Sequence, residues 1–146
     1  MIKDNDILYA FTETLNTKFN YKIDVKDNRK EVKEPTFFVS LAPLTTDSYL
    51  RWNEKLINVR IIYTNNVTNQ EELLNIKTQL DELFDMYIKV GPTSLVFKTK
   101  KFDKSENDDF LTLTITISYL DGKSNIPDAD KSAKLMENLN YRDGDE

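Results

Sequence analysis

Two apolar runs near the middle of the chain limit what it can fold into. Residues 36–42 are aromatic and β-branched, with a proline at each flank, where the hydrogen bonding of a strand ladder can stop. The apolar side chains of residues 55–64 fall on one face of an extended chain: Ile57, Val59, Ile61 and Tyr63. Because the connector between the runs is short, we predict that they pair as antiparallel strands in the middle of a sheet.

Two other segments have apolar residues at helical spacing. In residues 6–19 these are Ile7, Leu8, Phe11, Leu15 and Phe19. The second segment follows Asn69, which has capping-box spacing to Glu72, and its apolar stripe continues as far as Tyr87. Gly91 is expected to end this helix. Both segments are predicted to be amphipathic helices that face the core.

Three further strands are expected. Residues 21–25 alternate briefly between apolar and polar side chains, and residues 94–101 and 110–120 form two longer strands. In the last of these, the odd positions of residues 111–119 are apolar and the even positions between them are threonine or serine. This alternation predicts a strand with one buried and one solvated face.

Together these elements predict an α+β fold. We expect an antiparallel β-sheet with two long helices packed on one face, in the order α-β-β-β-α-β-β, followed by a C-terminal helical segment. Residues 1–122 form the predicted domain. Residues 123–146 are predicted to be an acidic C-terminal extension, partly helical or disordered.

The composition argues against catalysis. The chain of 146 residues contains no histidine, no cysteine and only 3 glycines. The missing side chains remove the usual general base, the Ser–His and Cys–His nucleophile systems and most zinc sites. So few glycines leave no loop that cradles a phosphate. We therefore expect a protein that is not an enzyme, with no catalytic residues, no metal site and no cofactor.

The charge and hydropathy bear on partners and location. A formal net charge of -5 argues against a general affinity for nucleic acid or anionic membranes. No apolar run approaches the roughly 18 residues that span a bilayer, and the N-terminus has no pattern of a signal peptide. The protein is expected to be made and kept in a cytoplasm, with no membrane partner.

Irregular segments beside the central strands are the candidates for contact with other molecules. Residues 27–34 are highly charged and without periodicity, residues 45–53 carry the only tryptophan, and residues 128–140 have a narrow apolar edge. In an oligomer, such segments can supply the complementary patches that join subunits. The candidate interface residues are Arg29, Lys30, Tyr49, Arg51, Trp52, Leu135, Met136 and Leu139.

The apolar residues of the connector and those of the strand after it would lie on opposite faces of one continuous strand. Leu50, Trp52 and Leu56 share one parity, whereas the apolar positions from Ile57 to Tyr63 have the other. A bulge near residues 53–56 would reconcile the two by re-aiming the strand. Alternatively, Leu50 and Trp52 face a partner while the later residues face the core.

The order of motifs resembles that of tail terminator proteins of tailed bacteriophages. The motifs are Pro-Thr-Phe-Phe-Val-Ser-Leu at residues 35–41 after a charged loop, and a long strand ending in Ile-Ile-Tyr at residues 61–63. An acidic-capped helix, a Val-Gly pair and two strands follow. The resemblance covers roughly residues 1–120 and is greatest to the small terminators of phages that infect Gram-positive hosts.

The resemblance implies a structural role in the virion. Proteins of this kind form a ring, typically hexameric, at the head-proximal end of the tail tube. The ring stops tube polymerisation and joins the tail to the head. The implied partners are other copies of the chain, the tail tube protein and the head–tail connector protein, while genome DNA passes through without specific binding. The implied location is the virion, after assembly in the bacterial cytoplasm.

Two other classes of function remain open from the sequence. Another virion component of the neck or tube would share the absence of catalytic groups. A small non-enzymatic adaptor of the host would bind a host protein as a monomer.

Overall fold

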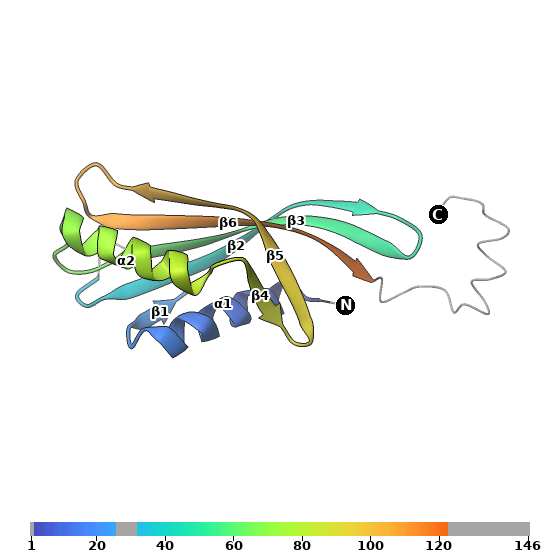
Figure 1. Cartoon of the computed structure of the whole chain (residues 1–146), viewed down its shortest axis with the longest axis horizontal. Helices are drawn as coiled ribbons and strands as arrows, with labels where there is room; N and C mark the ends of the chain where they lie inside the picture. Colours follow the sequence, from blue (N-terminus) through green and yellow to red (C-terminus); the bar gives the residue numbers. More distant parts are fainter. Residues whose placement is uncertain (1, 26–31, 123–146) are drawn as a thin grey trace, which may run out of the picture.

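The computed structural model describes residues 2–25 and 32–122, and the elements below lie within these ranges. In chain order they are α1 (Asp4–Lys18), β1 (Lys22–Asp24), β2 (Thr36–Ser48), β3 (Trp52–Thr64), α2 (Gln70–Leu83), β4 (Tyr87–Val90), β5 (Thr93–Lys104) and β6 (Phe110–Gly122). Figure 1 shows long strands running the length of the molecule, with both helices gathered toward one end. The described strands hold twice as many residues as the helices, so the fold is mostly β.

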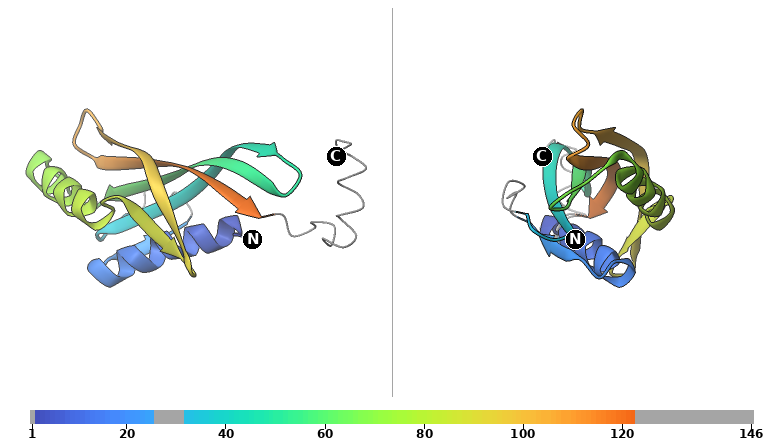
Figure 2. Two further views of the ribbon diagram at one scale, coloured as in Figure 1. Left: turned by 45° about the vertical axis from the view of Figure 1, so that its right-hand side comes forward. Right: turned by 90° about the vertical axis from the view of Figure 1, so that its left-hand side faces the viewer.

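The strands form one mixed sheet in the order β1-β2-β3-β6-β5-β4. The central ladders β2–β3 and β3–β6 are antiparallel, whereas β1 lies parallel to β2 at the edge. β5 changes partner along its length, pairing first with β4 and then, from Phe97 onward, with β6. The end-on view in Figure 2 shows a curled sheet that resembles half a barrel.

Both helices begin where the sequence supplies hydrogen-bond acceptors for free backbone N–H groups. The Asp6 carboxylate accepts from the backbone N–H of Lys3 at 3.2 Å, and the Asn69 side chain accepts from the backbone N–H of Glu72 at 2.8 Å. Each helix then buries one apolar stripe in the core. The buried residues are Ile7, Phe11 and Leu15 in α1, and Leu73, Ile76 and Leu80 in α2.

One core collects the inward faces of the helices and strands. It contains Phe11, Leu15, Leu80 and Phe84, together with the inward residues of β3 and β6 (Ile61, Leu113, Ile115 and Ile117), and Leu83 packs against it partly buried. Phe11 lies 5.2 Å from Phe84 and 6.1 Å from Phe97 between ring centroids, where α1, the end of α2 and β5 meet. The predicted antiparallel pairing of the central strands and the alternation of β6 are confirmed.

The second helix is shorter than predicted. α2 ends at Leu83, and the chain turns into β4, in which Ile88 and Val90 are buried while Tyr87 is 54% exposed. Gly91, with a φ of +62°, lies in the two-residue turn between Val90 and Thr93. A hairpin turn of this length needs a positive φ at its first central position, which glycine adopts without strain.

The predicted fold class, an antiparallel sheet with two long helices on one face, was wrong. The sheet is mixed, because β1 pairs parallel to β2 while the other ladders are antiparallel. It has six strands rather than five, because the segment after α2 forms β4. It also curls, so the helices do not cover one face of an open antiparallel sheet.

The core predicts a strong contrast between two leucines on α2. Leu80 is fully buried, whereas Leu74 is 45% exposed. Leu80→Ala should lower the free energy of unfolding by about 2–5 kcal/mol, because it removes buried methyl groups and leaves a cavity. The matched control Leu74→Ala should change it by less than about 0.5 kcal/mol. Urea unfolding of both variants measures the difference, and equal costs would contradict this packing.

Candidate functional site: the strand arm

The most prominent surface feature is a strand arm that extends beyond both helices. We define the arm as residues 43–56 of the β2–β3 hairpin together with residues 118–122 at the end of β6. Figure 1 shows it projecting from the base formed by the helices and the rest of the sheet. From Pro43 to Ser48 every residue of β2 is exposed. No helix in the described part of the chain covers either face of the arm at its tip.

The arm carries two open strand edges. β1 pairs with β2 only as far as Phe38, and β5 pairs with β6 only as far as Ile117. Among the described residues, the outer half of β2 and the last residues of β6 therefore have β3 as their one strand neighbour. Unpaired N–H and C=O groups along such edges are ready to pair with another chain.

Three predicted interface residues lie together at the tip of the arm. The backbone N–H of Tyr49 donates to the carbonyl of Trp52 at 2.9 Å, which closes the turn that contains Arg51. The rings of Tyr49 and Trp52 lie 5.8 Å apart between centroids, and the two residues are 46% and 43% exposed. The turn thus presents a pair of aromatic rings and one cation to solvent.

The register of β3 shows which of its side chains lie on the same face of the sheet. β3 and β6 pair without a shift from Trp52 opposite Gly122 to Thr64 opposite Phe110. The irregularity lies in β2 between Pro43 and Thr45, opposite Ile57 and Leu56, so β3 itself does not have the bulge near residues 53–56 that was one of the two alternatives. Since β3 alternates without interruption, Trp52 faces away from the side on which Ile57 is buried.

The β6 strand of the arm is tied to the N-terminal segment by one buried carboxylate. Both oxygens of Asp121 accept from the backbone N–H of Ile2, at 3.0 and 3.2 Å, and Lys55 Nζ lies 3.4 Å from Asp121. Asp121 is 5% exposed and the Lys55 side chain 14%. Because Asp121 pairs with Asn53, next to Trp52, these contacts hold the segment before α1 against β3 and β6 in the outer part of the arm.

Two buried tyrosines have perturbed hydroxyl groups. Burial, together with the nearby carboxylates of Asp4 and Asp121, raises the pKa of Tyr119 to about 12. Burial and the hydrogen bond that the Tyr63 hydroxyl donates to Glu72, at 2.6 Å, raise the pKa of Tyr63 well above its usual value. The Tyr119 hydroxyl has no hydrogen-bond partner among the described residues.

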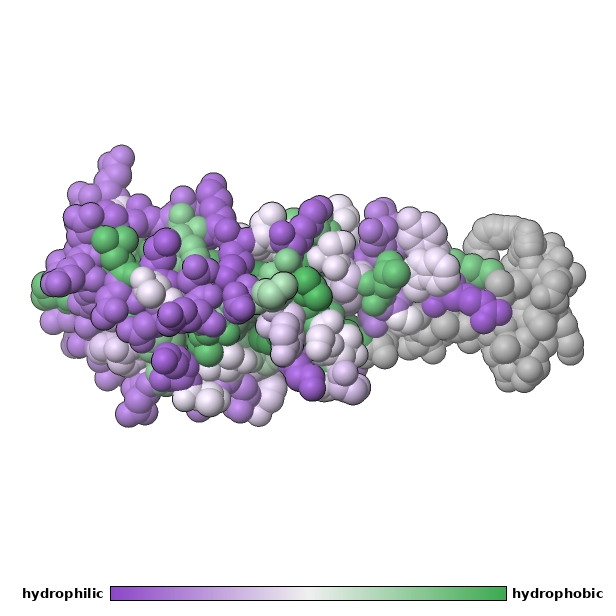
Figure 3. All heavy atoms as spheres, in the orientation of Figure 1, coloured by the Kyte–Doolittle hydropathy of each residue, from purple (hydrophilic) through white to green (hydrophobic). Residues whose placement is uncertain are grey.

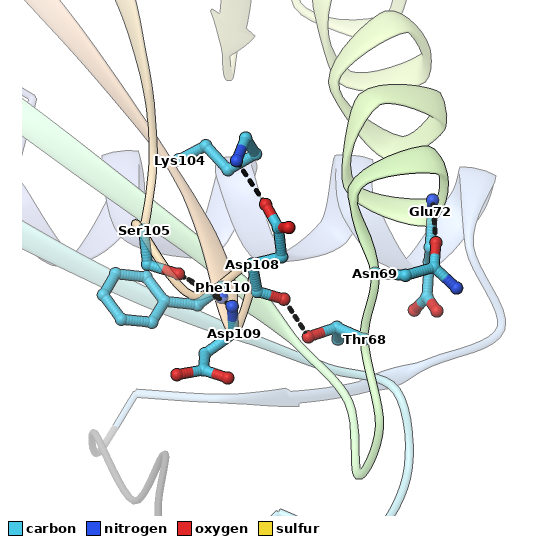
Figure 4. A network of polar contacts seen from close by, with 8 residues as sticks. All are labelled: Thr68, Asn69, Glu72, Lys104, Ser105, Asp108, Asp109 and Phe110. Carbon is cyan, nitrogen blue, oxygen red and sulfur yellow. Dashed lines mark hydrogen bonds and ion pairs between the residues drawn. The ribbon is translucent and has the colours of Figure 1, made fainter.

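The end of the base opposite the arm holds a polar network (Figure 4). Thr68 Oγ1 donates to the backbone carbonyl of Asp108, and Lys104 pairs with the Asp108 carboxylate. Ser105 Oγ accepts from the backbone N–H groups of Asp109 and Phe110, at 2.7 and 3.1 Å. Asp108 has a left-handed φ of +56°, which aspartate tolerates better than most residues. The polar groups satisfy one another, so the network ties two loops together.

The remaining predicted interface residues lie outside the described residues. They are Arg29 and Lys30 in the charged loop, and Leu135, Met136 and Leu139 in the C-terminal extension. Their roles stay predictions. Within residues 2–25 and 32–122 no group of three or more acidic side chains is arranged to hold a metal ion. Neither of the two described helices is long and apolar enough to cross a membrane.

Sequence reasoning missed several exposed apolar residues. Leu120 is 64% exposed on the arm, and Met86, Tyr87 and Val96 are exposed around the β4–β5 hairpin. A signal for Leu120 was present, because it is apolar on the parity that otherwise carries threonine and serine in β6. The hairpin residues could not be found while Tyr87 was assigned to a helix.

The fold and the arm define a domain whose exposed chemistry suits contact with other proteins. The family model described as "Phage tail terminator protein" matches residues 6–129, and the chain belongs to this family. It therefore has a structural role in the tail of a phage virion, which implies contacts with other tail and head–tail proteins. No curated protein matches the chain. The proposed Gram-positive host stays a prediction.

The unpartnered hydroxyl of Tyr119 predicts a stabilising substitution. Burying a hydroxyl without a hydrogen bond costs free energy, so Tyr119→Phe should raise the free energy of unfolding by about 1 kcal/mol at neutral pH. Urea unfolding of the purified chain measures this change. A loss of more than about 1 kcal/mol would show that the hydroxyl has a partner in the folded protein.

The same substitution predicts an altered response to alkaline pH. Because the folded-state pKa values of Tyr119 and Tyr63 lie above the unfolded value of 10.0, the unfolded chain releases these protons first. Stability should be unaffected by these groups below pH 10 and should fall as the pH rises from 10 toward 12. In Tyr119→Phe this fall should be shallower.

Proposed function

We propose that the chain assembles into a ring at the head-proximal end of the phage tail tube. There the ring ends polymerisation of the tube and presents a surface to the head–tail connector protein. Membership of the tail terminator family supports this role. The main structural support for a ring is the strand arm with its two open edges. Hexameric stoichiometry, implied by the resemblance to other terminators, is part of the proposal.

A projecting arm suits ring formation because a closed ring needs two different surfaces on each subunit. The arm lies beyond its own base, so the base of a neighbouring copy can meet it without competition from within the chain. Heterologous contacts of this kind repeat around the ring and close it when the rotation between subunits is right.

The charge of the chain fits a channel for DNA. A net charge of -5 repels the phosphates of passing DNA rather than binding them. The chain thus allows the genome to move through the ring without specific contacts.

We further propose that residues 123–146 act in joining the tail to the head. Leu135, Met136 and Leu139, which are apolar residues of this segment, would dock on an adjacent subunit or on a neck partner. The charged loop with Arg29 and Lys30 would contribute to the contact between subunits.

Control of tube length tests the role of the chain. Tail tube protein polymerising in the presence of the purified chain should form shorter tubes, with a ring of the chain at one end in electron micrographs. Unchanged tube length would contradict termination. Incorporation along the whole tube would instead indicate a tube subunit, and binding of a host protein by a monomer would indicate an adaptor.

Removal of residues 123–146 tests the extension separately. The truncated chain should keep the thermal unfolding midpoint of the full chain, because the described residues already supply one continuous core from both helices and the long strands. It should still shorten tubes but should reduce the yield of tails joined to heads in an assembly reaction. Full joining by the truncated chain would remove the extension from the mechanism.

A further inference from the structure

Two separate apolar patches lie on different parts of the molecule. The arm patch comprises Tyr49, Trp52 and Leu120, and the hairpin patch comprises Met86, Tyr87 and Val96; these six residues are 43–64% exposed. Figure 3 shows apolar side chains at the surface both on the base and along the arm. Exposed aromatic and methionine side chains are enriched where proteins meet.

The register places the members of the arm patch on one surface. Trp52 lies opposite Gly122, and Glu54 lies opposite Leu120, so Trp52 and Leu120 are diagonal neighbours on the same face of the β3–β6 ladder. Gly122, directly opposite Trp52, adds no side chain to this face. The Tyr49 ring lies against Trp52.

The hairpin patch is built in the same way. Tyr87 and Val96 are directly opposite in the β4–β5 ladder and share its outward face, since the alternate residue Ile88 is buried. Met86 precedes Tyr87 and is 64% exposed. The patch therefore covers the outside of a hairpin whose inner side is fixed in the core by Ile88, Val90 and Leu95.

The charges around the two patches are opposite. Asp47 and Glu54 flank the arm patch, whereas Lys89 and Lys98 flank the hairpin patch. None of these four residues forms an ion pair within the described ranges. Each patch also has one nearby charge of the other sign, and these two charges are again opposite to each other. They are Arg51 at the arm tip and Asp85, which precedes Met86.

We propose that the arm patch of one copy docks on the hairpin patch of the next copy. The occupant is a second copy of this chain, because the two patches are apolar at the centre and opposite in charge at the rim. Such a contact is heterologous: each subunit gives its arm to one neighbour and receives the arm of another. The proposal rests on the ring proposed above and names the surfaces that would join its subunits.

Two variants, one for each patch, test the contact. Trp52→Asp should abolish the arm patch and Tyr87→Asp the hairpin patch, each raising the dissociation constant for self-association by roughly thirtyfold or more. Sedimentation velocity of each full-length variant should show a shift from oligomer to monomer. Val67→Asp, at a side chain that is 78% exposed at the opposite end of the base, should leave the oligomer intact.

Mixing the two variants distinguishes this contact from other arrangements. The intact arm of the Tyr87→Asp chain should bind the intact hairpin patch of the Trp52→Asp chain, giving a 1:1 heterodimer that cannot grow further. A symmetric contact between two arms predicts instead that Tyr87→Asp alone remains a dimer, and that mixing adds nothing. A dimer formed by Tyr87→Asp alone would overturn the proposal, and so would a mixture of the two variants that forms no heterodimer.

The outcomes separate this inference from the proposed function. Rings formed by both variants would refute the docking while leaving tube termination standing. A heterodimer in the mixture, with wild-type chain that fails to shorten tubes, would support the docking and refute termination. A wild-type chain that stays monomeric at every concentration tested would refute both the ring and the docking. Unfolding midpoints within about 2 °C of wild type confirm that each variant is folded.

Discussion

The pairing of β3 with β6 is the interaction on which the rest of the structure depends. These strands run antiparallel without a register shift over their whole length, from the polar loops at one end of the molecule to the tip of the arm at the other. In the base, one face of this ladder supplies Ile57, Val59 and Ile61 to the core. In the arm, the same ladder continues after the helices have ended. A single pair of strands thus builds both the folded domain and its projecting surface.

Continuity of this ladder explains why the arm exposes aromatic residues. Side chains alternate strictly along a strand, so Trp52 lies on the face opposite to that of Ile57, Val59 and Ile61. No described helix reaches far enough to cover Trp52. The bulge in β2 between Pro43 and Thr45 leaves β3 unaffected because the extra residue lies on the partner strand. Exposure of Trp52 therefore follows from the geometry of the sheet.

Local patterns in the sequence were sufficient for the central part of the fold. The alternation in β6, the central antiparallel pairing and the Asn69 cap could all be predicted because each depends on a few neighbouring residues. The parallel position of β1 depends on where a crossover returns, which local pattern does not contain. β4 was missed because Tyr87 has helical spacing to Leu80 and Phe84, and only the tertiary structure shows that it is exposed. For the site, the only tryptophan pointed to the arm, but the hairpin patch could not be seen without β4.

The contact at Asp121 has a consequence for how an arm of this kind can bind. An exposed hairpin that moved freely would lose conformational entropy on docking, and this loss would weaken the association. Both oxygens of Asp121 instead share the backbone N–H of Ile2, and Lys55 lies beside them, so the outer part of the arm is held by the segment that leads into α1. A buried ion pair of this type contributes little net stability, because removing both charges from water offsets their attraction. Its effect lies in orientation: the arm leaves the base in one direction, so its outer face is already placed before a partner arrives.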